Sequence, residues 1–262
     1  MDTPEISWIN TALGYLLMLL PLSVFWFYQT GLVKDTLIAL GRMTAQLLII
    51  GLYLEFLFSL ESMWVNIVWI MIMVLVANYT ISQRSEIKMQ YFFWPIFWAV
   101  IISLAIVDAF FLGVAIRLDN VFETRYLIPI TGMILGNCLR TNIIALNTFY
   151  HSLSREKGRY HYFLSCGASQ SEALAPFMRD ALKTAFNPAI ATMAIVGIIS
   201  LPGAMTGQII SGTDPMLAIR YQLLFMITIF VASNLTVLLS ILLANRVTFD
   251  PFQRLKKDVV RK

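Results

Sequence analysis

Long apolar stretches constrain the fold of this chain more than any other feature of its sequence. A helix needs about 20 mostly apolar residues to span the hydrocarbon core of a bilayer, and the chain offers such a stretch repeatedly. Only 13% of its 262 residues are charged, whereas ordinary soluble domains carry about 25%. The sequence therefore predicts an all-α, polytopic membrane protein with about seven transmembrane helices. The predicted spans cover residues 8–28, 36–58, 63–81, 92–116, 126–150, 185–209 and 217–244.

Lysines and arginines are distributed unevenly between the loops, and this bias predicts the orientation of the chain. Cytoplasmic loops retain these residues in membrane proteins. With the N-terminus outside and the C-terminus inside, fifteen of the nineteen lie in segments on the cytoplasmic side. We therefore expect one transmembrane domain over residues 1–262, with a cytoplasmic loop at about 151–184 and a short basic cytoplasmic tail at about 245–262.

The longest polar loop, residues 154–183, contains too many apolar residues for a disordered linker. Ser169 and Glu172 have the Ser-x-x-Glu spacing of a capping box, which predicts that a helix begins there. Gly167 and Ala168 come directly before it and predict a break between two short helices. Two interpretations stay open: an amphipathic helix that lies on the lipid headgroups, or a helical elbow presented to a cytoplasmic partner.

Several catalytic motifs are absent from the sequence. It has no G-x-x-x-x-G-K-[ST] phosphate loop, so the chain is not expected to hydrolyse ATP by that machinery. It has neither a G-x-S-x-G elbow nor an H-E-x-x-H motif, which argues against an intramembrane protease. No basic patch interleaved with aromatic residues suggests nucleic-acid binding. We therefore expect a membrane protein that is not an enzyme, binds no cofactor of its own and has no nucleic-acid partner.

Four ionisable residues lie within the predicted spans, where such residues are costly and mark functional sites. They are Arg42, Glu55, Asp108 and Arg140. Glu55 is close to the outer end of its span, where exposure at the interface explains it. Arg42, with Gln46 one turn further along the helix, either snorkels to the inner headgroups or packs in a polar role.

Asp108 and Arg140 lie deeper in their spans and have no such simple explanation. An ion pair between the two is one option, although their depths in the membrane match only loosely. We predict that Asp108 faces an internal cavity.

The stretch SLPGAMTGQIISGTDP, residues 200–215, places Gly and Pro residues directly after an apolar run. At membrane depth, irregular backbone persists only where protein buries it or where it lines a water-filled cavity. Broken helices of transporters use such backbone to bind substrates and ions. The stretch is therefore either a gate near the outer end of the sixth span or an outer re-entrant loop after a span that ends at Ile199.

Two G-x-x-x-G motifs bear on helix packing, because small residues let helix backbones approach each other closely. One motif joins Gly132 to Gly136, and the other joins Gly203 to Gly207. Each adjoins polar or helix-breaking residues, so packing alone is an incomplete explanation for them.

Four segments together resemble a known family. They read GRMTAQLLIIG (41–51), IPITGMILGN (128–137), LSCGASQSEA…RDALKTAFNP (164–188) and LPGAMTGQIISGTDPMLAIRYQ (201–222). In these segments the chain is similar to the FetB family of ABC transporter permeases, which are linked to iron export and have plant aluminium-tolerance proteins as relatives. The resemblance implies a homodimeric permease in a bacterial inner membrane. It also implies a separate cytoplasmic ATPase subunit that binds ATP and Mg²⁺ and is seated on the loop at 151–184.

The resemblance and the ionisable residues together give the expected site residues. Those of the transport pathway or gate are Arg42, Gln46, Asp108, Met133, Asn137, Arg140, Pro202, Gly203, Met205, Gly207 and Gln208. Those that couple to the ATPase are Gly167, Ala168, Ser169, Glu172 and Arg179. No metal ligands are assigned, and Met133 and Met205 are the candidates of soft-ligand type.

Two departures from the family pattern affect the expected cargo. Ala204 stands where the family commonly has the first methionine of an LPGMM motif, which weakens a soft metal site. Arg140 is not part of the pattern, and an arginine in the pathway favours an anionic or chelated cargo over a bare cation.

Three functions are therefore carried forward. The first is an ABC permease that exports iron, another metal or a metal complex. The second is an ABC permease for an organic anion such as a sugar nucleotide, whose phosphate Arg140 and Arg42 would hold by charge-assisted hydrogen bonds. The third is a stand-alone ion-coupled transporter with Asp108 as the titrating group. Dependence on ATP and on an ATPase partner separates the third from the other two.

Overall fold

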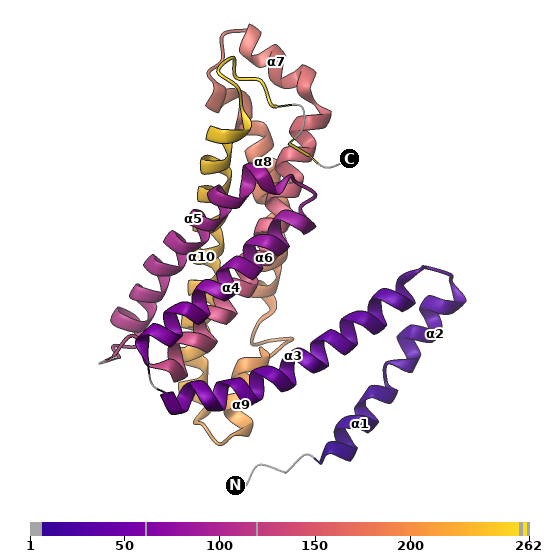
Figure 1. Ribbon diagram of the computed structural model, residues 1–262, viewed down its shortest axis with the longest axis vertical. Helices are drawn as coiled ribbons and strands as arrows, with labels where there is room; N and C mark the ends of the chain where they lie inside the picture. Colours follow the sequence, from indigo (N-terminus) through magenta and orange to yellow (C-terminus); the bar gives the residue numbers. More distant parts are fainter. Residues whose placement is uncertain (1–6, 61, 119, 257–258, 261–262) are drawn as a thin grey trace. The chain divides into compact units, whose positions relative to one another are not determined.

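A computed structural model of the protein describes residues 7–60, 62–118, 120–256 and 259–260. The side chains of Leu52, Glu55 and Ser59 are not described, so the expectation for Glu55 lies outside the described part. The chain is all-α, as predicted. Its helices in chain order (Figure 1) are α1 (Trp8–Leu16), α2 (Leu19–Phe27), α3 (Leu32–Leu60), α4 (Met63–Arg84), α5 (Met89–Asp108), the π-helix η1 (Ala109–Ala115), α6 (Thr124–Arg155), α7 (Lys157–Ser165), α8 (Gln170–Ile195), α9 (Gly203–Ile210) and α10 (Pro215–Thr248).

Six helical segments in the described part of the chain are long and apolar enough to cross a membrane. Each coincides, within a few residues, with one of the predicted spans, so the apolar pattern located these helices correctly. The first of them is divided into α1 and α2, which are separated by Leu17 and Met18. The six segments are Trp8–Phe27, Leu32–Phe58, Met63–Arg84, Met89–Ala115, Thr124–Arg155 and Pro215–Thr248.

The predicted span at 185–209 is not one helix. α8 begins fifteen residues earlier, at Gln170, and ends at Ile195. Gly197 then adopts a φ of +86°, a left-handed conformation that only glycine takes up without strain. After an irregular segment, Gly203 begins the short helix α9. The break therefore comes two residues before Gly197, ahead of the Pro-Gly pair that the sequence singled out.

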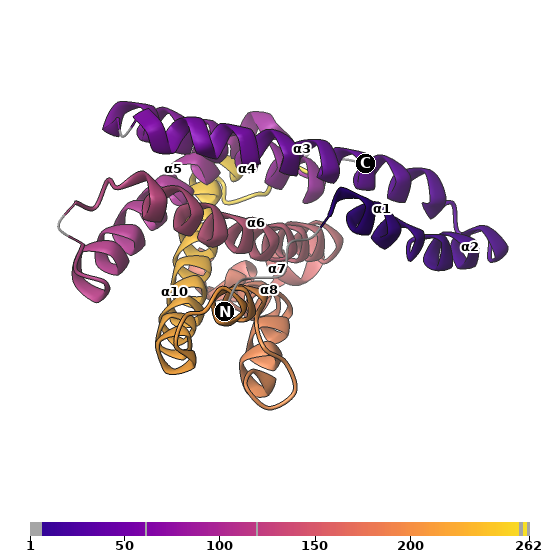
Figure 2. The ribbon, with the colours of Figure 1, turned by 90° about the horizontal axis from the view of Figure 1, so that it is seen from below.

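The chain divides into two compact units. The first contains α1, α2 and α3 and also Ile210–Gly212. In it the α1–α2 pair folds back beside α3 (Figure 2), and the hydroxyl groups of Tyr15 and Thr44 share a hydrogen bond of 2.6 Å. Most side chains of these helices are exposed, including large apolar ones such as Leu47. Exposed apolar helix faces are what a membrane-spanning segment presents to lipid.

The second unit is a bundle around α6, which packs against α4, α8 and α10, and α5 lies against α10. Ile134, Phe149 and Tyr150 of α6 are fully buried in its core. Polar side chains tie the helices of this bundle together. Asn66 of α4 donates from Nδ2 to the Thr124 hydroxyl at 2.9 Å, and Asn78 donates to the backbone carbonyl of Phe93 at 2.9 Å. Such bonds contribute about 0.6 kcal/mol each to helix association in membranes.

Gly132 of α6 lies against the side chain of Met73 of α4. A Cβ atom added at Gly132 would lie 3.1 Å from the terminal methyl group of Met73, whereas one added at Gly136 meets nothing within 4 Å. We expect Gly132→Leu to destabilise the bundle by about 1–3 kcal/mol, because overpacking forces side chains and backbone apart. Thermal unfolding of the purified chain in detergent measures this effect. Gly136→Leu is the matched control, and equal melting temperatures of the two variants would contradict the assignment.

A segment after α10 folds back onto the bundle. Residues 249–256 and 259–260 are called the C-terminal strap here, and Figure 1 shows this segment beside α7. Tyr160 of α7 donates its hydroxyl to the carbonyl of Gln253 at 2.8 Å. Between α4 and α5, the backbone N–H of Lys88 donates to the carbonyl of Val259 at 3.0 Å. The strap therefore connects α7 to the α4–α5 turn.

Candidate transport cavity and coupling elbow

A cavity of about 210 Å³ lies between α6, α8 and α10. Both α8 and α10 pack along α6, but the two pack little against each other, and Figure 2 shows them apart at the lower end of its view. Phe186 of α8 and Phe230 of α10 are in edge-to-face contact, with ring centroids 5.5 Å apart. α8 and α10 both pack against α6 but separate from each other, so a space stays open between the three helices.

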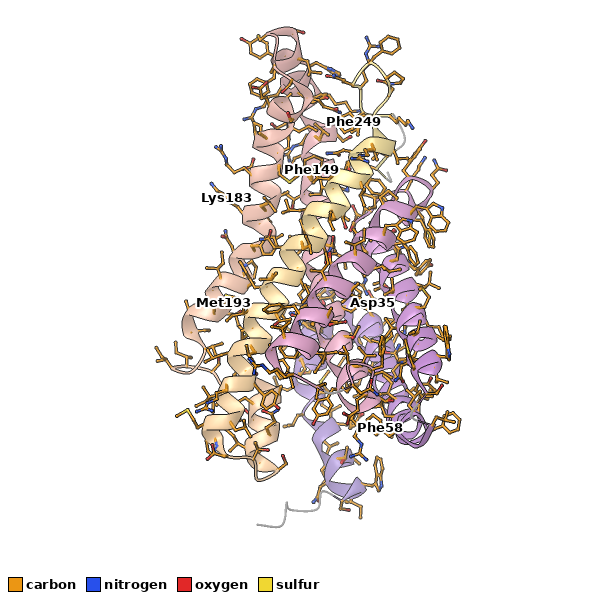
Figure 3. The ribbon with its side chains drawn as sticks, turned by 90° about the vertical axis from the view of Figure 1, so that its left-hand side faces the viewer. Asp35, Phe58, Phe149, Lys183, Met193 and Phe249 are labelled. Atoms are coloured by element: carbon orange, nitrogen blue, oxygen red, sulfur yellow. The ribbon has the colours of Figure 1, made fainter. Side chains whose placement is uncertain are left out.

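The residues that line this cavity follow the helical repeat, because positions i, i+3, i+4 and i+7 share one face of an α-helix. α6 supplies Asn137, Arg140, Thr141 and Ile144; α8 supplies Ala185, Phe186, Pro188, Ala189, Thr192 and Met193; α10 supplies Met226, Ile229, Phe230 and Ser233. Figure 3 labels Met193 on α8 and shows Lys183, which is not in the lining, projecting away from α10. Two residues predicted for the pathway, Asn137 and Arg140, are thus brought together here.

The polar groups of the cavity include two threonine hydroxyls that donate to backbone carbonyls and one cationic side chain, Arg140. Thr141 donates its hydroxyl to the Asn137 carbonyl at 3.0 Å, and Thr192 donates to the Pro188 carbonyl at 2.9 Å. These hydroxyl oxygens retain lone pairs and act as acceptors. Arg140 is exposed, and its guanidinium is a donor with a permanent positive charge. The lining therefore suits a ligand with an anionic group and with hydrogen-bond donors of its own.

Asp108 lies at the junction between α5 and the π-helix η1, and it is only 8% exposed. The Thr131 hydroxyl donates to its Oδ2 at 2.8 Å, and its Oδ1 has no hydrogen-bond partner within the described residues. π-helical turns within α-helices often mark functional sites. A buried carboxylate with one unpartnered oxygen, at such a turn, is a costly arrangement.

The Asp108–Arg140 ion pair that the sequence offered as an option does not form in the part of the chain that the structure describes. Asp108 contacts α6 at Thr131, and Arg140 comes nine residues later on the same helix. At 1.5 Å per residue this is a separation of about 14 Å along α6, too far for contact. Asp108 does not line the α6–α8–α10 cavity, and its role in transport stays a prediction.

The predicted capping box is present. Ser169 is the N-cap of α8, its backbone N–H donates to Glu172 Oε2 at 2.8 Å, and its Oγ accepts from the Glu172 N–H at 3.4 Å. The hydrogen bond from the Ser169 hydroxyl, followed by the one from its backbone, lowers the pKa of the Glu172 carboxyl below its ordinary value. This carboxylate is therefore ionised, and the positive N-terminal end of the α8 dipole stabilises its negative charge.

The predicted break before the capping box is also confirmed. α7 ends at Ser165, and Gly167 adopts a φ of +89°, a conformation that glycine takes up without strain. The segment from α7 to the start of α8 is called the elbow here. Gly167, Ser169 and Glu172 lie at the elbow and are exposed, and Ala168 is half-buried beside them. Arg179, predicted as the fifth coupling residue, lies exposed about two and a half turns into α8.

α8 joins the elbow to the cavity without interruption. The loop and the sixth span were predicted as separate segments, but one helix of 26 residues contains the last part of the loop and the first part of the span. Its first turn is capped at the elbow, and its second half provides the cavity wall from Ala185 to Met193. Pro176 and Pro188 lie inside this helix. The cap at Ser169 could be predicted from sequence, but the continuity of the helix through the charged stretch could not.

The residues predicted around the Pro-Gly break lie on or beside α9. Met205 is buried, and Pro202 and Gln208 are half-buried. A Cβ atom added at Gly203 or Gly207 meets nothing within 4 Å. This G-x-x-x-G motif therefore does not bring two helices together within the described chain, unlike Gly132.

The remaining predicted residues do not join the cavity. Met133 is half-buried on α6, and its carbonyl accepts a hydrogen bond from Asn137 Nδ2 at 2.9 Å. Arg42 and Gln46 are exposed on α3 in the first unit. Within the described residues, no group of three or more His, Cys, Asp or Glu side chains could hold a metal ion.

Three polar residues of the bundle were missed by the sequence reasoning. Asn66, Asn78 and Thr131 are all buried, and each makes a hydrogen bond to another helix or to a neighbouring segment. The two asparagines had a detectable signal, because an amide within an apolar span needs a partner. Thr131 had none, since a threonine in a membrane helix is often satisfied by its own backbone.

Comparisons with known proteins place the chain in a family of membrane proteins. The model of an uncharacterised protein family, UPF0014, matches residues 8–249. The UPF0014 membrane protein YjkA of Bacillus subtilis is 29% identical, over 96% of this chain and 99% of its own length. The protein named "Probable iron export permease protein FetB" of Escherichia coli is 28% identical, over 99% of this chain and 97% of its own. The UPF0014 membrane protein STAR2 of rice is 33% identical, over 81% of this chain and 73% of its own. No solved structure matches the chain.

Proposed function

Because the chain belongs to the UPF0014 family of multi-pass membrane proteins, we propose that it is the permease subunit of an ABC transporter that exports iron, another metal or a metal complex. The observation that carries this proposal is its similarity, over 99% of the chain, to a protein named as a probable iron export permease. The proposed machinery further comprises a second copy of the chain and a cytoplasmic ATPase that binds ATP and Mg²⁺, in a bacterial inner membrane.

The continuity of α8 supplies a mechanism for this function. A helix of 26 residues spans about 39 Å and transmits a displacement along its length. When the ATPase closes on ATP and pushes the elbow, the cavity wall from Ala185 to Met193 moves with the elbow. Pro188 lacks an N–H and so weakens the helix within this wall. The wall is therefore the place where α8 bends, and the cavity opens or closes there.

The second candidate cargo, an organic anion or an anionic metal complex, is favoured by Arg140. A guanidinium on a membrane helix carries a cost in free energy, and such residues mark functional sites. Here it lines the cavity beside hydroxyl acceptors. A bare cation would be repelled by this charge. A metal ion whose chelator carries negative charge would be attracted, so the two candidates share one recognition chemistry.

The test measures the total metal content of iron-loaded cells by mass spectrometry. Cells that express the chain with its active ATPase are compared with cells whose ATPase cannot hydrolyse ATP. We expect lower iron only with the active pair. Arg140→Gln should reduce export by about 10- to 100-fold, since a hydrogen bond to a charged group contributes about 1.5–3 kcal/mol. Arg220→Gln is the matched control, because Arg220 is exposed on α10 outside the cavity lining.

Each contrary outcome has a defined meaning. Iron content that stays at the level of cells without the chain, with the active and the inactive ATPase alike and at equal amounts of chain in the membrane, would contradict metal export and favour an organic anion. Iron export that is unchanged by Arg140→Gln would contradict the anionic form of the cargo while leaving metal export in place. Export that persists with the inactive ATPase would favour the stand-alone ion-coupled transporter.

A further inference from the structure

A second cavity, of about 420 Å³, lies between the first turns of α8 and the last turns of α10. It is called the elbow groove here. It is separate from the transport cavity, with which it shares no lining residue. Its lining includes Ser171, Leu174 and Met178 of α8 and Leu242, Asn245 and Arg246 of α10.

The lining of the elbow groove changes from polar to apolar along its length. α8 begins at the level where α10 ends, so Ser171 of α8 and Arg246 of α10 share one end of the groove. Moving away from this end, α8 contributes Leu174 and then Met178, and α10 contributes Leu242. Leu242 is 55% exposed, which leaves an apolar surface open to a ligand.

Charge at the polar end favours an anion. Arg246 is exposed there, and Asn245 accepts a hydrogen bond from Tyr150 at its Oδ1, so its amide nitrogen is the part that can donate to a ligand. The acids nearest in sequence to the lining are Glu172 and Asp250. Glu172 is held by Ser169 in the capping box, and Asp250 Oδ1 accepts from the backbone N–H groups of Phe252 and Arg254. The positive charge of Arg246 therefore has no carboxylate in the groove lining to neutralise it.

We propose that the elbow groove binds an anionic phospholipid, whose phosphate contacts Arg246 and Asn245 and whose first methylene groups lie against Leu174, Met178 and Leu242. The seventh predicted span ends at residue 244, which puts Arg246 at the level of the lipid headgroups. Basic pockets between membrane helices bind anionic headgroups in this way. An amphiphile satisfies both ends of the groove, whereas a free phosphate ion satisfies only the polar end.

Binding in the elbow groove involves the first turns of α8, the part of the helix that the proposed mechanism moves. The groove is bounded on one side by the first turns of α8, directly after the cap at Ser169. A lipid in the groove therefore lies between the first turns of α8 and the last turns of α10. Lipid binding is inferred from the groove alone, and only its effect on the movement of α8 rests on the proposed function.

The experiment measures lipid binding to the purified full chain in detergent by native mass spectrometry. Phosphatidylglycerol and phosphatidylcholine with identical acyl chains are the probes, and glycerol 3-phosphate is the probe for the headgroup alone. We expect the wild type to retain phosphatidylglycerol in preference to phosphatidylcholine. Arg246→Gln should weaken phosphatidylglycerol binding about fivefold, since one basic residue near an anionic lipid contributes about 1 kcal/mol.

Two further variants make the test specific to the groove. Lys183→Gln removes a positive charge from the side of α8 that faces away from α10 (Figure 3) and should leave binding unchanged. Met178→Trp fills the apolar part of the groove and should weaken binding of both lipids. Equal retention of the two lipids by the wild type, equal effects of Arg246→Gln and Lys183→Gln, or glycerol 3-phosphate binding as tightly as the lipid would each overturn the proposal.

Discussion

The double variant Gly167→Trp, Glu172→Arg is expected to abolish transport and to remove the ATPase from the purified complex. Gly167 adopts a φ of +89°, at which a tryptophan costs about 1–3 kcal/mol in backbone strain. Glu172→Arg removes the acceptor of the capping box and places a positive charge at the positive end of the α8 dipole. The first turn of α8 then loses its cap and its backbone conformation at the surface proposed to bind the ATPase. Transport should fall to the level of cells that lack the chain.

Gly14→Trp is the matched control for this experiment. Gly14 lies in α1, outside the elbow, and a Cβ atom added there meets nothing within 4 Å, so the same change in size is made without backbone strain. The measurements are ATPase retained on affinity purification, ATP hydrolysis by the purified complex and cellular iron content. If the double variant retains its ATPase and still transports, the elbow is not the coupling site.

Asp108→Leu is expected to keep the fold and to reduce transport at least tenfold. In the wild type one carboxylate oxygen of Asp108 is buried without a partner within the described chain. Apolar replacement of buried ionic groups is often neutral or stabilising by about 1–4 kcal/mol, so Asp108→Leu should melt no lower than the wild type. A buried group that lowers stability is expected at a functional site, where proteins depart from the rules of stable packing. Melting temperature and cellular iron content, measured on the same variant, separate the two effects.

Thr131→Val is the comparison for this variant. It removes the donor to Asp108 Oδ2 and leaves the whole carboxylate buried without a partner, which should destabilise the chain by about 1–3 kcal/mol. Asp108→Asn retains an oxygen to accept from Thr131 and should keep the stability of the wild type while losing transport. Normal transport by Asp108→Leu would show that the carboxylate is structural only.

The positions of the helices could be predicted from sequence where residues within or next to the helix determine them. The apolar stretches located six of the predicted spans, and the Ser-x-x-Glu spacing located the start of α8. These signals are local, because burial in lipid depends on composition and capping depends on neighbours three residues apart.

The sixth span and the cavity depended on features that a local pattern does not contain. α8 continues through the charged residues Arg179, Asp180 and Lys183, which are exposed, because its other face packs against α6. Its end is set by the conformation of Gly197 rather than by the more conspicuous Pro-Gly pair. Asn137 and Arg140 were candidates from sequence, but the α8 and α10 residues opposite them are ordinary apolar ones apart from Thr192 and Ser233. Only the structure, which places these α8 and α10 residues opposite Asn137 and Arg140, identifies them as part of the cavity.

The C-terminal strap places a limit on the order in which this protein is built. Its hydrogen bonds tie Tyr160 and Lys88 to Gln253 and Val259, residues that leave the ribosome after every helix described here. The bundle can insert and pack while translation continues, but α7 and the α4–α5 turn are joined only after residue 259 has emerged. An ATPase that recognises α7 in its strapped position would thus engage chains whose strap has been synthesised and pass over shorter nascent ones.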